Sequence, residues 1–155
     1  MNPIVLATVL LLVGGVVCAD DAEEASIKVQ EYFDAFNARD VDKITSEVYA
    51  MPVHIGSGAE HRVLIDEQAA TDNLRTLYAQ LDEQGWARSE IREINGCSVA
   101  PGMVFADVTY SRIDKGGNAI PPDLRTNLYI LRGHEDGWRI IAFYIHATDK
   151  TVGCR

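Results

Sequence analysis

Basic residues are scarce in this chain of 155 residues. It has 14 Lys and Arg against 23 Asp and Glu, which gives a formal net charge of −9 at pH 7. A nucleic-acid partner requires a basic stripe that meets its phosphates, so this charge balance argues against one. The simplest consequence of the acidic excess is solubility.

Several motifs that carry chemistry are also missing. The four histidines are scattered, and no two histidines or cysteines have the spacing of a zinc site. The sequence has neither a glycine loop that cradles phosphate nor a nucleophile elbow, so we predict no metal and no cofactor. With 47% hydrophobic and 24% charged residues and no low-complexity tract, the composition is that of one folded domain.

The N-terminal segment, residues 1–19, reads as a cleaved export signal. Its apolar run, Ile4–Val17, is shorter than the roughly 20 residues that span a membrane. Small residues before Asp20 fit a signal-peptidase cut, which predicts export to the periplasm or medium and a mature domain of residues 20–155. We expect no other membrane contact. Lipid anchoring at Cys18 is less favoured, because Val17 stands where a lipobox has Gly, Ala or Ser.

Cysteine occurs only three times. Removal of the signal leaves Cys97 and Cys154, and an oxidising compartment favours pairing of an even number. A disulfide requires Cα atoms within about 7 Å, and the sequence does not show whether the C-terminal tail folds back that far. A disulfide and two unpaired thiols therefore both stay open.

The first half of the chain predicts three helices. Apolar residues recur at three- and four-residue spacing from Ala25 to Phe36, which indicates a helix with one wide buried stripe. Asp40 can cap a short second helix, and Asp66 can cap the longest one, which runs to about Gln84. A small hairpin over residues 51–65 lies between them.

The second half predicts four long strands, with Gly, Asn and Asp in the turns between them. They cover residues 86–99, 103–112, 124–132 and 138–146. This order predicts an α+β fold, a strongly curved, mostly antiparallel sheet wrapped by three N-terminal helices into a cone. The open mouth of such a cone is where a small molecule binds.

Two stretches carry a resemblance to a known family. They are residues 29–44, VQEYFDAFNARDVDKI, and residues 136–140, DGWRI. Together with the element order, they resemble the nuclear transport factor 2-like superfamily, which includes ketosteroid isomerases, SnoaL-like cyclases and scytalone dehydratase. The resemblance implies a cystatin-like cone. Because members include enzymes, binding modules and adaptors, it leaves the function open.

The resemblance also assigns residues. Tyr32 falls where a ketosteroid isomerase has its oxyanion-hole tyrosine, and Asn127 where it has a protonated aspartate, so both could polarise a substrate oxygen. The general-base aspartate of that family falls near Gly56, which has no side chain. The steroid-isomerase mechanism is therefore not supported.

Other candidates depend on which way the strands face. Asp107 is an acid within an apolar strand; it is a candidate acid or base if it faces the cone, and a polar outer residue otherwise. His54 is a candidate base or a hydrogen-bonded wall residue. The alignment with the family turns Asp107 inward, where His146 could pair with it. The expected ligand-binding residues are Tyr129, Tyr144, His146 and Trp86, although core packing is the favoured role of Trp86.

Three functions fit these features. The first is a cofactor-free isomerase, dehydratase or cyclase that acts on a small, mostly apolar molecule. The second is a ligand-binding or dimerising module without catalysis. The third is an adaptor that binds through the outer sheet face, where Tyr110, Leu128 and Ile130 would be exposed. A homodimer through this outer face is also expected.

Overall fold

The computed structural model describes residues 18–153, with side chains from residue 21 onward. Most of the predicted export signal and Cys154 lie outside the described residues. Within them, no helix has the length and apolar composition needed to cross a membrane. The elements are, in order, α1 Cys18–Ala38, α2 Val41–Lys43, the π-helical turn η1 Ile44–Val48, β1 Tyr49–Ser57, β2 Glu60–Leu64, α3 Glu67–Glu83, β3 Trp86–Ala100, β4 Met103–Asp114, β5 Arg125–His134 and β6 Gly137–His146.

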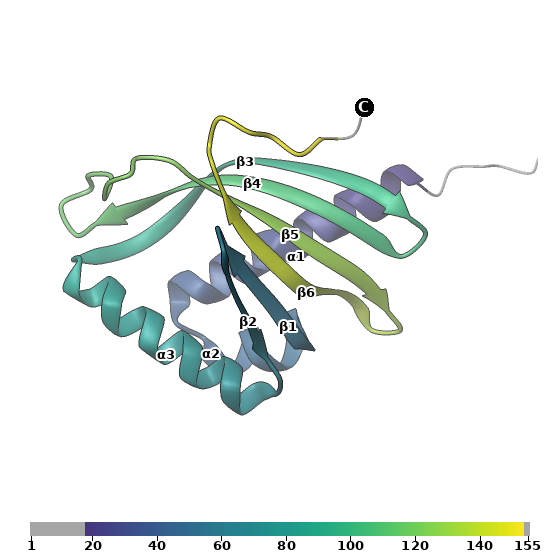
Figure 1. The fold of residues 1–155 in the computed structure, drawn as a ribbon, viewed down its shortest axis with the longest axis horizontal. Helices are drawn as coiled ribbons and strands as arrows, with labels where there is room; N and C mark the ends of the chain where they lie inside the picture. Colours follow the sequence, from purple (N-terminus) through teal and green to yellow (C-terminus); the bar gives the residue numbers. More distant parts are fainter. Residues whose placement is uncertain (1–17, 154–155) are drawn as a thin grey trace, which may run out of the picture.

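The strands form one six-stranded mixed sheet in the order β2-β1-β6-β5-β4-β3. Only β1 and β6 pair in parallel; the other neighbours are antiparallel. Figure 1 shows the sheet curving over α1, with α3 beside β2 and the start of β3. The predicted α+β cone is therefore confirmed.

The second and third helices begin where the sequence predicts, whereas α1 already begins at Cys18, within the predicted export signal. The Oδ1 atom of Asp40 accepts a hydrogen bond from Lys43 N at 3.0 Å, and Asp66 Oδ1 accepts one from Ala69 N at 2.8 Å. Both are N-cap contacts that satisfy a free helix N–H group. The stripe of α1 packs under the sheet, and its members Ala25, Val29, Tyr32, Phe33 and Phe36 are all buried.

An amide clamp joins α1 to β3. Asn37 Nδ2 donates to the carbonyl oxygen of Ser89 at 2.9 Å, and Ser89 N donates to Asn37 Oδ1 at 2.7 Å. The side chain therefore pairs with β3 much as another strand would. This clamp fixes the end of α1 against the sheet.

The register of β4 decides which side chains face the helices. Ala106 lies opposite Tyr129 and Val108 opposite Asn127, so these four side chains share the concave face. Asp107 lies opposite Leu128 on the outer face. The expectation that Asp107 faces the cone is therefore wrong, because neighbouring residues of a strand point to opposite faces.

A β-bulge reverses the face of β6. Leu131 pairs with Ile140 but Ile130 pairs with Ala142, so Ile141 is the extra residue. Before the bulge Trp138 and Ile140 face the core. After it, Phe143 and Ile145 face inward and line the cavity described below.

Tyr144 and His146 consequently lie on the outer face, opposite Leu128 and Thr126. Their predicted place inside the cone is wrong. Strict alternation from Ile140 would have turned both inward, and the bulge shifts them by one position. The sequence pattern does not show that extra residue.

The C-terminal tail crosses the outer face. His146 and the Val152 N–H group both contact the carboxylate of Asp107, which is 3% exposed. Cys97, which shares this face opposite Phe105, is disulfide-bonded. The side chains of the other two cysteines, Cys18 and Cys154, lie outside those described.

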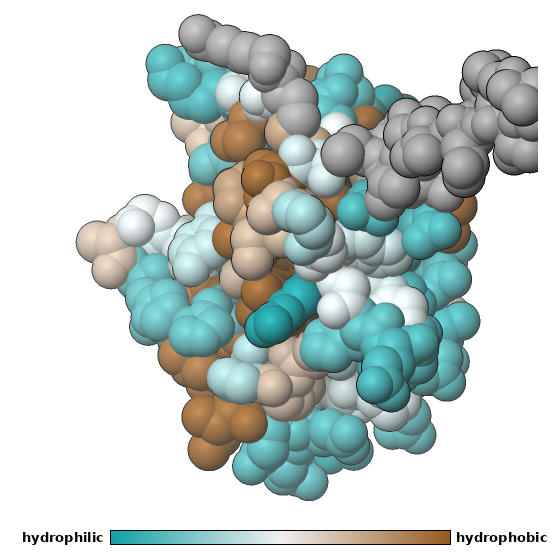
Figure 2. Space-filling view, turned by 90° about the vertical axis from the view of Figure 1, so that its right-hand side faces the viewer, coloured by the Kyte–Doolittle hydropathy of each residue, from teal (hydrophilic) through white to brown (hydrophobic). Residues whose placement is uncertain are grey.

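The outer face is less open than the adaptor hypothesis requires. Tyr110 is buried on the concave side, and Leu128 and Ile130 are only half exposed. On the side shown in Figure 2, apolar residues form a broken band among hydrophilic ones. The homodimer through this face stays a prediction.

Candidate functional site

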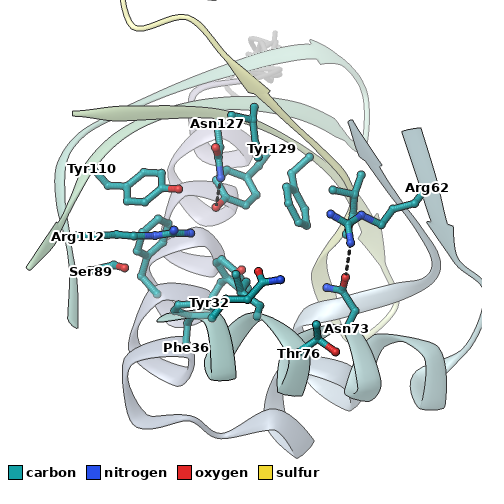
Figure 3. Close-up of a pocket in the computed structure, with 16 residues that line it drawn as sticks. Tyr32, Phe36, Arg62, Asn73, Thr76, Ser89, Tyr110, Arg112, Asn127 and Tyr129 are labelled. Carbon is teal, nitrogen blue, oxygen red and sulfur yellow. Dashed lines mark hydrogen bonds between the residues drawn. The ribbon is translucent and has the colours of Figure 1, made fainter. Parts of the chain in front are cut away.

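A cavity of about 180 Å³ lies between α1, α3 and the concave face of the sheet. Figure 3 shows its wall and the side chains that reach into it. It is lined by Tyr32, Phe33, Phe36, Ile55, Arg62, Asn73, Thr76, Leu77, Gln80, Ser89, Tyr110, Arg112, Asn127, Tyr129, Phe143 and Ile145.

Aromatic rings form the main wall. The ring centroid of Tyr32 lies 5.6 Å from that of Phe33, 5.6 Å from that of Tyr129 and 5.8 Å from that of Phe36. The Tyr129 ring in turn lies 5.6 Å from the Phe143 ring. These are favourable ring separations, so the wall is a connected cluster supplied by α1, β5 and β6.

The tyrosines of this cluster stay protonated at neutral pH. Burial raises the pKa of Tyr32 to about 12, although a hydrogen bond with Tyr49 opposes the rise. Burial also raises the pKa of Tyr129 well above its usual range. Both phenols are therefore neutral near pH 7 and act as hydrogen-bond donors or acceptors rather than bases.

Two polar side chains in the cavity have buried atoms with no hydrogen-bond partner in the part of the chain that the structure describes. Asn127 is 5% exposed, and its Nδ2 donates to Tyr129 Oη at 3.2 Å. Among the described residues, no group forms a hydrogen bond with Asn127 Oδ1 or with the buried Nε of Arg112. Buried polar atoms are normally satisfied, so these two indicate a place for a ligand or water.

The charge lining the cavity is entirely positive. Arg62 and Arg112 are its charged members among the described residues, and Figure 3 shows them on opposite sides of the space. Arg62 Nη1 donates to Asn73 Oδ1 at 3.0 Å. The described lining contains no Asp, Glu, His or Cys. This contrasts with the acidic chain as a whole.

The structure places part of the predicted site in this cavity. Tyr32, Asn127 and Tyr129 line it, as expected. Asp107, Tyr144 and His146 do not, because they lie on the outer face. The expected contact between Asp107 and His146 does form, at 2.8 Å, but it binds the tail instead of a ligand.

His54 and Trp86 also lie apart from the cavity. His54 is on β1, two residues along from the outward Gly56, and its Nδ1 lies 3.3 Å from His61 Nε2. Trp86 is 1% exposed and packs on Phe36 and Tyr78, with Nε1 donating to Ser89 Oγ. The favoured interpretation of Trp86, as core packing, agrees with this position. For His54, the position agrees with the alternative of a hydrogen-bonded residue and not with that of a base in the cone.

Replacing Gly56 by a residue with an acidic side chain would not place a base in the cavity. A Cβ atom there would point at the Tyr144 ring, which is on the outer face. A longer side chain at this position would thus leave the cone rather than enter it. Gly56 therefore lacks the aspartate of ketosteroid isomerases, and its backbone also points away from the place where such a base would act.

Sequence reasoning missed several cavity residues. Arg112 and Tyr110 lie on the concave alternation of β4, whereas the alignment with the family turns the alternation of Asp107 inward and places Tyr110 on the outer face. Asn73 and Thr76 belong to the polar side of α3, which reads as solvent-facing. Correct pairing of β4 with Asn127 and Tyr129 is the signal that would have revealed Tyr110 and Arg112.

The family described as NTF2-like protein (DUF6841) matches residues 22–148. This chain is an NTF2-like protein of that family. No curated protein is significantly similar to the chain.

Solved structures agree with the assignment of the NTF2-like fold. An NTF2-like protein with a cystatin-like fold from Novosphingobium aromaticivorans is 13% identical, with a TM-score of 0.67 over 86% of this chain and 85% of that one. Aln2 from a Streptomyces species is 14% identical, with a TM-score of 0.64 over 82% and 90% of the two chains. A ketosteroid isomerase-like protein from Erwinia carotovora atroseptica is 14% identical, with a TM-score of 0.58 over 81% and 95%. At these identities the likeness concerns the fold alone.

Proposed function

We propose that this NTF2-like domain is a binding module that holds one small, mostly apolar molecule in its cone without transferring a proton. The observation that carries the proposal is the aromatic cavity itself. Its described lining offers rings for contact and a few polar atoms for orientation, which is the usual make-up of a ligand pocket.

Ligand size follows from the volume. A dry cavity of about 150 Å³ accommodates one benzene ring. The cavity here is of about 180 Å³, so it suits a single ring with a short substituent. A fused steroid skeleton is too large unless the helices separate.

The case for binding over proton transfer rests on the titrating groups. A general base needs a pKa near the working pH and must reach the proton that it removes. The raised pKa values of Tyr32 and Tyr129 disfavour their phenolates, and Asp107 and His54 face away from the cavity. These positions support the binding module.

Proton-transfer catalysis is the second candidate, because Tyr32 and Asn127 both line the cavity as a two-donor site would require. It would need a base carried by the substrate or by a bound water. Turnover of any substrate that is lost with Tyr32→Phe but not with Asp107→Asn would favour it over simple binding.

Thermal-shift measurements with single-ring compounds test the binding proposal. A ligand at 100 times its Kd adds about 2.7 kcal/mol to the free energy of unfolding, which raises the Tm of a domain of this size by roughly 5–10 °C. We expect such a shift with the unmodified domain.

Thr76→Trp provides a blocked variant. Thr76 is exposed on α3 and lines the cavity, whereas Ala79 is exposed on the same helix but does not line it. Thr76→Trp should abolish the shift, and Ala79→Trp should retain it. If no single-ring compound stabilises the unmodified domain, the binding proposal is wrong.

A further inference from the structure

The described arginines differ in whether a carboxylate pairs with them. Outside the cavity, ion pairs join arginines to carboxylates: Arg39–Asp82, Arg75–Asp72, Arg88–Glu90, Arg92–Glu90 and Arg139–Asp136. Among the described residues, no carboxylate forms an ion pair with Arg62 or Arg112, which line the cavity, or with Arg125 or Arg132. Of these four, only Arg112 has a buried nitrogen atom with no hydrogen-bond partner in the described chain.

The guanidinium of Arg112 also has a donor that forms no hydrogen bond within the described chain. Its Nε is buried without a hydrogen-bond partner in the described chain. It lies opposite Ser89 on β3, and Figure 3 shows its side chain directed from β4 into the cavity. A guanidinium is planar and presents a fork of donors, so an anionic planar acceptor fits it best.

A second guanidinium, that of Arg125, adds to the positive charge near Arg112. Arg125 donates from Nη1 to the carbonyl oxygens of Ile120 and Pro122, and from Nη2 to that of Pro121. Burial lowers its pKa, and the nearby charge of Arg112 lowers it further. Two neighbouring cations favour a bound anion.

The field of Arg112 reaches the aromatic wall. Its charge opposes the rise in pKa of both Tyr32 and Tyr129, which means that it favours negative charge in the cavity. The space beside it is walled by rings. Within the described chain, Asn127 Nδ2 donates to Tyr129 Oη, whereas Asn127 Oδ1 has no hydrogen-bond partner. Asn127 Oδ1 therefore offers a further polar contact near the same wall.

We infer that the cavity binds a small aromatic carboxylate, with the ring among Tyr32, Tyr129 and Phe143 and the carboxylate on the guanidinium of Arg112. This inference rests on the proposed binding function and adds the chemical class of the ligand. The carboxylate satisfies the free donors of Arg112 and neutralises its charge. The ring occupies the volume that the aromatic wall encloses.

Four probes on the unmodified domain separate ring from charge. Benzoate has both, benzamide has the ring alone, acetate has the carboxylate alone, and benzyl alcohol has the ring with a neutral hydroxyl. Isothermal titration calorimetry should show benzoate binding at least tenfold more tightly than benzamide or benzyl alcohol. Acetate should show no measurable binding, because it lacks the ring contacts.

Two charge-removing variants complete the test. Arg112→Met should weaken benzoate by about tenfold to a hundredfold, as loss of charge-assisted hydrogen bonds predicts, and leave benzamide nearly unchanged. Arg88→Met is the matched control, because Arg88 is exposed on β3, pairs with Glu90 and does not line the cavity. It should bind benzoate as the unmodified domain does.

The outcomes distinguish the two proposals. Equal affinity for benzoate and benzamide, or full benzoate affinity in Arg112→Met, would overturn the carboxylate inference while the binding function stands. Absence of binding by all three ring compounds would overturn both. Because the benzoate-to-benzamide ratio is measured on the unmodified domain, the inference stays testable even if Arg112→Met does not fold.

Discussion

The Nε2 atom of His146 lies 2.8 Å from Oδ1 of Asp107, across the outer face of the sheet and away from the cavity. The second carboxylate oxygen of Asp107 accepts the Val152 N–H group at 2.7 Å. A buried carboxylate with both oxygens engaged is well satisfied. Asp107 therefore fastens the C-terminal tail to β4, which is a structural role.

Replacing Asp107 tests this role. Asp107→Ala leaves the Val152 N–H group and His146 without their partner, so we expect the free energy of unfolding to fall by about 1–3 kcal/mol. Urea unfolding measures that loss, and hydrogen exchange at Val152 should become faster. Thr109→Ala, on the same face of the same strand, is the control. A change in ligand affinity with Asp107→Ala would contradict the outward position.

The clamp between Asn37 and Ser89 should be a large contributor to stability. Asn37→Ala removes both hydrogen bonds and leaves the Ser89 backbone groups unpaired at a partly buried site. We expect a loss of about 2–3 kcal/mol in the free energy of unfolding. Gln30→Ala, which breaks an exposed contact on the same helix, should cost much less. Similar losses for the two variants would contradict the clamp.

Alkaline pH should destabilise the domain through its buried tyrosines. The folded-state pKa of Tyr32 is about 12 and its unfolded value is about 10, so the stability is fully present below pH 10 and is lost as the pH rises towards 12. Tyrosinate absorbance should therefore rise together with unfolding. Tyr32→Phe removes one such group and should flatten the fall in stability above pH 10. An unchanged slope would count against burial as the cause.

Gly56 is predicted to tolerate no Cβ while Tyr144 is present. An added methyl group would lie 2.6 Å from Cε1 of the Tyr144 ring, so Gly56→Ala should lower the free energy of unfolding by about 1–3 kcal/mol. Tyr144→Ala removes the obstacle. In that background the same change at Gly56 should cost little, as a double-mutant cycle would measure. Additive losses would show that the two residues do not meet.

Isomerisation of a steroid enone should be undetectable. The cavity is small, and the resemblance to ketosteroid isomerases assigns their base to Gly56, which has no side chain and faces Tyr144. Dienone or enone absorbance measures the conversion directly. Turnover above the rate in buffer would show that another group serves as base.

The fold was predictable because its signals are local. The stripe of α1 repeats through four turns, and capping residues mark the starts of α2 and α3. The hairpin turns carry the residues that permit tight reversal, such as Gly102 and Gly137 with positive φ. Each of these patterns is complete within a few residues of sequence.

The cavity was only partly predictable because strand faces depend on pairing. Both alternations of β4 contain apolar residues: Val104, Ala106 and Val108 on one face, and Phe105 on the other. The outer acid Asp107 is stabilised by the distant tail, a contact that no local pattern reveals. Arg112 lies beside a polar turn, so the sequence alone suggests a solvent-exposed side chain. Its pairing with Ser89, which is bonded to Asn37 of α1, shows that it lies on the face that α1 covers.

The bulge at Ile141 lets one strand serve two different interiors, the core around Trp138 and the cavity around Phe143. Its position also sets what the cavity can become. If Ile141 stayed in the strand and paired with Ile130, the bulge would be lost, and Tyr144 and His146 would replace Phe143 and Ile145 on the concave face. A one-residue shift in the register of β6 beyond Ile140 would thus supply an imidazole to a wall that now presents hydrocarbon, which makes this bulge a short evolutionary step between binding and catalysis.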